Sequence, residues 1–173
     1  MKIYLAPVKF YNTLLIDKIR SELTRYLSYE IRQVELKINI ENSYSKERHQ
    51  YFSTQIISEA IKQTKTLNGK VVILTKVDLF IPVLTFVFGE AQLNGRHSIV
   101  SLCRLHEEFY TGKTDEGLLL KRTLKEILHE LGHNFGLKHC SDWDCVMHSS
   151  TSIEEVDIKG DNYCKVCELR VRL

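Results

Sequence analysis

The sequence of 173 residues lacks the features that mark several classes of protein. Its net charge is only +2, with 24 basic and 22 acidic residues interspersed along the chain. This balance provides no electrostatic argument for binding nucleic acid or an anionic membrane. No apolar run approaches the roughly 20 residues that a membrane-spanning helix needs. We therefore expect neither nucleic acid nor a membrane among its partners.

The chain also has little that would divide it into separate parts. It contains two prolines and eight glycines, and no linker-like tract, internal repeat or low-complexity segment. A chain of this length can bury a substantial core, so residues 1–173 are predicted to form one domain. The first nine residues are too short and too interrupted for a signal peptide, and they indicate a first strand. We expect a monomeric cytoplasmic protein.

Hydrophobic periodicity predicts two strand-then-helix units at the beginning of the chain. A strand over residues 3–8 precedes a helix that Asn12 caps. Apolar residues alternate over 34–38, which predicts a half-buried strand, and a second helix is predicted over 53–66. A fully apolar strand follows at 71–75. Strands joined by helices of this length imply parallel pairing.

The pattern changes in the second half of the chain. Strands are predicted at 86–91 and 97–102, and the turn between them is too short for a crossover helix. At least one of them should therefore run antiparallel to the others, which gives a mixed α/β (α+β) sheet. Thr114 is predicted to cap a long helix that spans about 114–136.

The most informative segment is the pattern H-E-x-x-H-x-x-G-x-x-H in this long helix and just beyond it. His129 and His133 are four residues apart, so on a helix their rings lie on one face. Glu130 can act as general base toward a metal-bound water. Gly136 lets the helix end in a left-handed conformation, and His139 then approaches as a third ligand. Three protein ligands leave one position open, as in catalytic zinc sites.

Five cysteines are present, and four of them follow the histidines. Cys140, Cys145, Cys164 and Cys167 suffice to close a tetrahedral structural zinc site. A redox role for the C-x-x-C pair is the alternative, and the second pair of cysteines favours zinc. Cys103 lies in an apolar run and is predicted to be a small buried core residue.

These residues carry a resemblance to a known family. The extended histidine motif followed by Met147 resembles the metzincin metalloproteases. The cysteine that directly follows His139, then Cys145-Val146-Met147, then the Cys164/Cys167 knuckle are similar to the archaemetzincin branch. The spacing between Met147 and Cys164 is slightly shorter than is typical of that branch.

The resemblance implies a zincin-type fold with an antiparallel edge strand and two zinc ions. It implies that three histidines hold a catalytic zinc, with Glu130 as base and Met147 as the methionine of the Met-turn. It further implies that four cysteines hold a structural zinc. In this scheme residues 1–136 form an upper part with the active-site helix, and residues 137–173 form a lower part. Because His139 and Cys140 are consecutive, a rigid metal site at Cys140 would also restrict His139.

The resulting functional hypothesis is zinc-dependent hydrolysis of peptide bonds. An extended peptide would pair with the edge strand, with residues 89–95 as its rim. Tyr110, Tyr163 and His148 are candidates by residue type for stabilising the oxyanion. Aminopeptidase activity is reported for some family members and little activity for others, and the sequence does not choose between aminopeptidase and endopeptidase. Two alternatives are a catalytically silent or narrowly gated zinc protein that binds a peptide or protein partner, and a four-cysteine interaction module.

Overall fold

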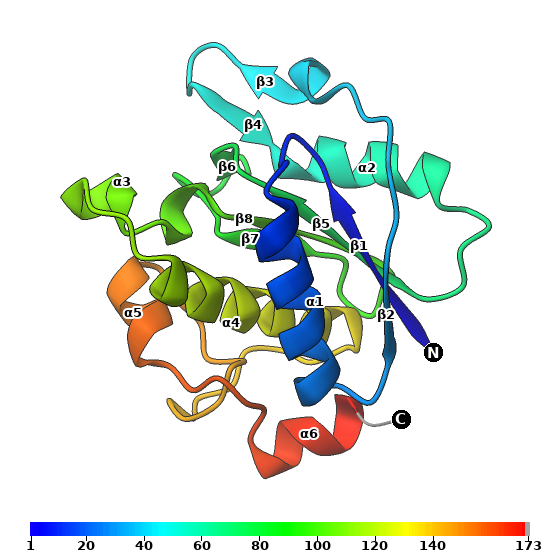
Figure 1. Ribbon diagram of the computed structural model, residues 1–173, viewed down its shortest axis with the longest axis vertical. Helices are drawn as coiled ribbons and strands as arrows, with labels where there is room; N and C mark the ends of the chain where they lie inside the picture. Colours follow the sequence, from blue (N-terminus) through cyan, green and yellow to red (C-terminus); the bar gives the residue numbers. More distant parts are fainter. Residues whose placement is uncertain (172–173) are drawn as a thin grey trace.

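The computed structural model describes residues 1–171, and its central feature is a five-stranded sheet (Figure 1). The strand order is β2-β1-β5-β8-β7. In that order the strands are Glu30–Gln33, Lys2–Pro7, Lys70–Thr75, His97–Ser101 and Gly89–Ala91. All neighbours pair in parallel except β7, which runs antiparallel to β8 at one edge. The predicted mixed sheet with an antiparallel edge strand is confirmed.

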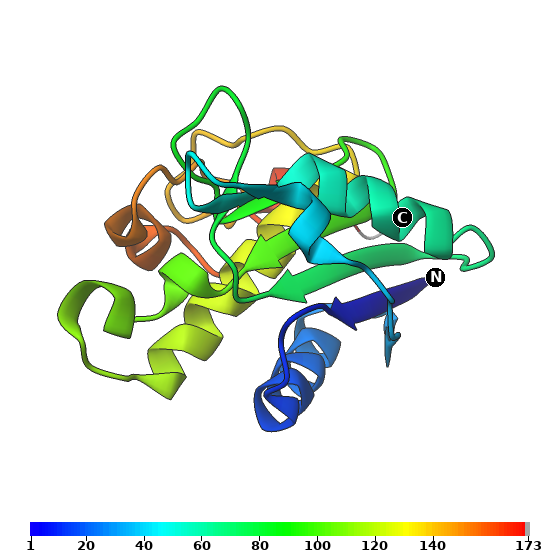
Figure 2. The same cartoon turned by 90° about the horizontal axis from the view of Figure 1, so that it is seen from above.

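Helices cover both faces of the sheet (Figure 2). α1 (Thr13–Tyr26) and α4 (Glu116–Asn134) pack on one face, and α2 (Ser53–Gln63) packs on the other. Alternate residues of the strands therefore face two separate cores, which explains why β5 shows no polar alternation. α1 begins as predicted, because the Leu15 N–H donates to Asn12 Oδ1 over 3.0 Å.

Shorter elements surround the central sheet and its three covering helices. A small sheet in the order β3-β4-β6 lies beside α2, and α5 and α6 follow the active-site helix toward the C-terminus. The remaining bounds are η1 Ile40–Ser43, β3 Tyr44–Ser45, β4 Gln50–Phe52, β6 Leu79–Phe80, η2 Cys103–Leu105, α3 Glu108–Thr111, α5 Ile153–Ile158 and α6 Lys165–Val171. None of the helices within residues 1–171 combines the length and the hydropathy required to cross a membrane.

Three local predictions were wrong. Residues 34–38 do not form a strand, because pairing with β1 ends at Gln33 and the apolar side chains beyond it pack beside α2 without a strand ladder. Asp115, not Thr114, caps α4, and its Oδ1 accepts the Leu118 N–H over 2.9 Å. Cys103 is only half-buried, because β8 ends two residues earlier and the chain turns into η2.

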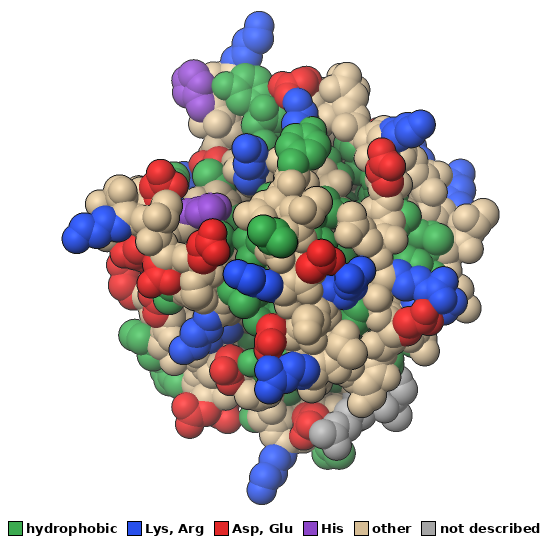
Figure 3. Space-filling view, viewed as in Figure 1, with side chains coloured by type: hydrophobic (Ala, Val, Ile, Leu, Met, Phe, Trp, Pro, Cys, Tyr) green, Lys and Arg blue, Asp and Glu red, His purple; other side chains and the backbone are tan. Residues whose placement is uncertain are grey.

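The surface reflects the near-neutral composition. On the face shown in Figure 3, acidic and basic side chains are interspersed and neither sign covers a large continuous area. Hydrophobic side chains emerge among them only in small groups. This face therefore offers no extended electrostatic field to a charged polymer.

Candidate metal centres

Helix α4 carries the first part of the site and ends in a defined C-terminal cap. Gly136 has a φ of +87°, in the left-handed region that favours glycine. The Gly136 N–H donates to His133 O, and the Leu137 N–H donates to Gly132 O, each over 2.9 Å. This 5→2 and 6→1 bonding is the Schellman motif. It turns the chain back toward the helix, which brings His139 beside the two helical histidines.

The three histidines form one cluster, in which one ring nitrogen of each lies within 4.8 Å of the others. His129 Nδ1 and His133 Nδ1 each lie 2.8 Å from a backbone carbonyl, of Val146 and Leu137 respectively. Because a carbonyl can only accept, both Nδ1 atoms carry hydrogen. The two Nε2 atoms are then both free to act as ligands.

These Nε2 atoms face each other across 3.1 Å. Two acceptor nitrogens at this distance repel each other unless a cation lies between them. Zinc–nitrogen bonds of about 2.0–2.1 Å at a tetrahedral angle place two nitrogens roughly 3.3 Å apart. The histidine geometry therefore fits a zinc ion. Burial lowers the pKa of His129, His133 and His139, which favours the neutral, metal-binding form of each ring.

Glu130 is buried beside this cluster and faces the edge strand. Burial raises the pKa of its carboxyl well above the usual value, and the nearby Glu126 carboxylate raises it further, whereas Lys159 lowers it. Gly89 of β7 makes room for the carboxylate. A Cβ at that position would lie 2.7 Å from Glu130 Oε1 and 2.8 Å from the Ile99 carbonyl oxygen. Sequence reasoning missed this role of Gly89, because it arises from a contact between a helix and a strand.

Met147 lies beneath the helical part of the site and is fully buried. A Cβ at Gly132 would lie 2.2 Å from Met147 Sδ and 3.2 Å from Tyr163 Cε1. Gly132 therefore allows the methionine to approach the helix backbone between the two helical histidines. The sequence contained one indication of this contact, namely Gly132 itself. A glycine inside a helix is unfavourable unless packing requires it.

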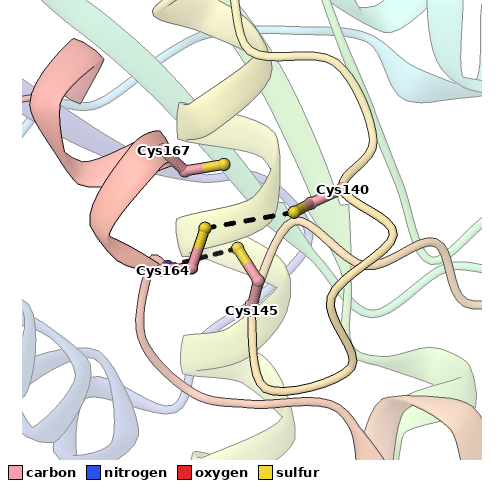
Figure 4. Close-up of side chains that lie close together, drawn as sticks. All are labelled: Cys140, Cys145, Cys164 and Cys167. Carbon is pink, nitrogen blue, oxygen red and sulfur yellow. Dashed lines mark hydrogen bonds between the residues drawn. The ribbon is translucent and has the colours of Figure 1, made fainter.

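The four later cysteines form a second cluster (Figure 4). Their sulfur atoms all lie within 4.8 Å of one another, and none is in a disulfide. Cys140 Sγ and Cys164 Sγ are 4.0 Å apart, and the Cys164 N–H donates to Cys145 Sγ over 3.3 Å. Zinc–sulfur bonds of about 2.3 Å separate tetrahedral thiolates by roughly 3.8 Å. The four thiols, including Cys167 on α6, thus fit a closed zinc site.

The two clusters share a short backbone connection. Cys140 directly follows His139, and the Cys140 N–H donates to the Met147 carbonyl over 3.0 Å. Val146, the preceding residue, accepts the Nδ1–H of His129. The loop that carries two cysteines therefore also orients two of the three histidines, which agrees with the predicted coupling of the two sites.

Comparison with known proteins places this geometry in a family. The sequence model of peptidase family M54 matches residues 15–172. The chain belongs to this family. Curated archaemetzincins include one from Methanopyrus kandleri, 38% identical over 154 residues that cover 88% of this chain and 83% of that protein. Another, from Thermococcus kodakarensis, is 35% identical and covers 98% and 94% of the two chains.

Solved archaemetzincin structures share the whole fold. The archaemetzincin of Archaeoglobus fulgidus, crystallised with malonate, superimposes with a TM-score of 0.83 at 31% identity and covers 99% of this chain and all of that one. A protein from Methanocorpusculum labreanum, described as a zinc-dependent peptidase, gives a TM-score of 0.88 at 26% identity, with 98% and 99% of the chains covered. As a member of this family, the chain is a zinc metallopeptidase.

A cleft of about 870 Å³ opens beside the three histidines. Gly89, Glu90, Ala91 and Leu93 line it together with Glu130 and the histidines, so four residues of the predicted rim at 89–95 border the cleft. The three residues suggested by type for the oxyanion do not line it in the described part of the chain.

Each of those three side chains has another partner. Tyr163 donates its hydroxyl to the Leu128 carbonyl, and Tyr110 donates to the Arg104 carbonyl over 2.9 Å. His148 Nδ1 lies 3.1 Å from the Cys140 carbonyl, and the ring stacks on Trp143 with centroids 3.8 Å apart. Their contacts support structural roles.

Charged side chains of α4 bind the segment around α5 beneath the site. Arg122 forms two hydrogen bonds with the Asp157 carboxylate, of 2.7 and 2.6 Å. Lys125 Nζ donates to the carbonyls of Val156, Asp157 and Lys159 over 2.6–2.8 Å. Sequence reasoning missed these contacts, because charged residues on a helix usually indicate its solvent-exposed face.

Proposed function

We propose that this chain hydrolyses peptide bonds with one catalytic zinc ion, held by three histidines, and one structural zinc ion, held by four cysteines. The observation that carries the proposal is the pair of Nε2 atoms of His129 and His133, which face each other across 3.1 Å without a hydrogen between them. His139 completes the first site, and Cys140, Cys145, Cys164 and Cys167 form the second.

Zinc at the histidine site supplies a Lewis acid that polarises a substrate carbonyl and makes water acidic near neutral pH. The chain's own residues perform the proton transfers. Glu130 accepts a proton from the attacking water at its buried carboxylate and passes it to the departing amine. The raised pKa of this carboxyl suits both steps, since a stronger base accepts the first proton and a weaker acid holds it until the amine leaves.

The edge strand β7 supports the binding of an extended substrate. It is paired with β8 on one side, and residues of β7 line the cleft beside Glu130. A peptide that added to this edge would place its main chain next to the histidines through strand-like hydrogen bonds. We propose peptides or proteins as substrates, acted on by a monomer in the cytoplasm. Aminopeptidase activity would additionally require an anionic group that binds the free ammonium group of the substrate.

Replacing Glu130 with glutamine tests the proposal. Glu130→Gln should retain both zinc ions by elemental analysis and lose at least about 100-fold in kcat, because general base catalysis contributes roughly 10²–10⁴-fold. Glu35→Gln, on the exposed surface, is the matched control and should keep full activity. Hydrolysis is followed with a library of blocked and free peptides, with and without a zinc chelator. Unchanged turnover in Glu130→Gln would refute the role of the base, and chelator-insensitive hydrolysis would refute the role of zinc.

A further inference from the structure

Two carboxylates that line the cleft are engaged by other residues of the protein. Glu90 projects from β7 toward α2, where Ser53 Oγ and Thr54 Oγ1 each donate to one of its oxygens, the second over 2.8 Å. Both donors belong to the first turn of α2, whose helix dipole also favours a negative charge. Glu126 accepts from the buried ammonium group of Lys159 over 2.7 Å. Lys159 therefore compensates the charge of Glu126, and the two hydroxyl donors hold the Glu90 carboxylate on the α2 side of the cleft.

Lys138 also lines the cleft, and unlike Glu126 it has no ion-pair partner among residues 1–171. Its side chain is exposed, and no carboxylate of residues 1–171 lies within ion-pair distance of it. Its backbone is nevertheless fixed, since Leu137 is buried and bonded to the end of α4, and Cys140 is bonded to Met147. An exposed cationic side chain thus extends from a fixed backbone next to His139.

A further part of the cleft wall is apolar, and its backbone is held in place. Arg48 Nη1 donates to the Leu84 carbonyl over 2.8 Å, and Gln50 Nε2 donates to the Thr85 carbonyl over 3.0 Å. These bonds come from the β3–β4 hairpin and fix the backbone of a segment that lines the cleft. The large apolar residues of the lining are Ile81, Leu84, Phe86, Val87, Phe88 and Leu93.

We propose that Lys138 determines specificity by selecting peptides with a carboxylate near the scissile bond, in a segment that also presents a bulky apolar side chain. This proposal rests on the proposed peptidase function. Lys138 and the apolar residues line the same cleft, so a bound peptide meets both. The low-dielectric walls of a cleft strengthen the attraction between a cation in it and a carboxylate. The carboxylate belongs either to an Asp or Glu side chain or to the free C-terminus of the peptide.

Peptide binding to the Glu130→Gln protein tests this selection without turnover. The ligands are fluorescent peptides with blocked ends and one apolar core, which differ only in an internal Asp, Asn or Lys. A fourth peptide carries Asn and a free C-terminal carboxylate. The Asp peptide or the free-acid peptide should bind about fivefold more tightly than the blocked Asn peptide, and the preference should shrink as salt is added. Whichever binds more tightly identifies the source of the carboxylate.

Charge reversal gives the decisive comparison. In the same background, Lys138→Glu should favour the Lys peptide over the Asp peptide, and Lys138→Gln should bind the Asp and Asn peptides equally. Lys113→Glu, at an exposed lysine outside the cleft, should keep the original order. Equal binding of all peptides by the protein that retains Lys138, or an unchanged order in Lys138→Glu, overturns the proposal. Absence of chelator-sensitive hydrolysis by the unmodified protein would instead refute the peptidase function, and the binding order would still be measurable.

Discussion

Lys159 Nζ donates to Glu126 Oε1 over 2.7 Å, and the two side chains are 0% and 5% exposed. The pair joins the segment after α5 to the active-site helix, one turn before Glu130. Its positive member also lowers the pKa of His129 and of Glu130. A buried ion pair thus connects the C-terminal part of the chain to the residues that are proposed to perform the chemistry.

Removing one member of this pair should be strongly destabilising. Lys159→Met leaves the Glu126 carboxylate buried without its cation, and such a loss costs about 3–5 kcal/mol of unfolding free energy. Denaturant titration measures the loss. Combining Lys159→Met with Glu126→Leu should recover most of it, since no charge is then left unpaired. The control Lys62→Met breaks the exposed pair with Glu59 and should cost less than about 1 kcal/mol. Similar losses in the two lysine variants would contradict the prediction.

Gly132→Ala should destabilise the protein although alanine favours helices. The new Cβ would lie 2.2 Å from Met147 Sδ, and overpacking of this kind costs about 1–3 kcal/mol. Helix propensity returns only about 1 kcal/mol. Gly117→Ala in the same helix is the matched control, because the atom nearest to its Cβ, Asp115 Oδ1, is 3.5 Å away, and it should stabilise the fold. The prediction fails if both alanine variants raise the midpoint of chemical unfolding.

Cys164→Ser should affect both metal centres. The loss of one thiolate opens the four-cysteine site, and the loop from Cys140 to Met147 then no longer holds His139 in place. We expect zinc content to fall from two ions per chain to one or fewer, together with reduced hydrolysis. Cys103→Ser, outside both clusters, should retain both ions. Elemental analysis of the two purified variants provides the measurement, and equal zinc content in both would rule out the four-cysteine assignment.

His97 should make the protein less stable in acid. Burial lowers the pKa of its imidazole, and the positive charge of Arg96 lowers it further. The ring contacts Thr64 Oγ1 over 2.7 Å and Gln92 Oε1 over 3.2 Å. The unfolded chain binds a proton at a pKa of about 6.5, above the folded value, so stability falls as the pH drops below that point and levels off under the folded pKa.

The measurement is the unfolding free energy between pH 7.5 and pH 5, compared with that of His97→Gln. The difference between the two proteins removes the pH dependence of the metal ligands, which they share. The variant should lose less stability on acidification than the unmodified protein. Parallel pH curves would show that His97 does not contribute.

Local spacing made the metal ligands predictable. His129 and His133 share a helix face by geometry alone, and Gly136 marks the end of that helix through its permitted left-handed conformation. Residues 34–38 show the limit of such reasoning. Their alternation correctly indicated burial, but a strand also needs a ladder of backbone hydrogen bonds, and the pairing of this segment with β1 ends at Gln33. The family resemblance, rather than periodicity, indicated that the antiparallel strand lies at the edge.

The sequence by itself determined which residues could hold metal and that the sheet would be mixed, because these depend on residue type, short spacing and hydrophobic period. Only the tertiary structure decided what surrounds them. Gly89 contacts Glu130, and Lys159 contacts Glu126 across 33 positions. Lys138 lines the cleft next to His139, and no carboxylate of residues 1–171 forms an ion pair with it. These contacts depend on how helices, strands and loops pack together. A contact between residues far apart in the sequence produces no periodic pattern from which it could be predicted.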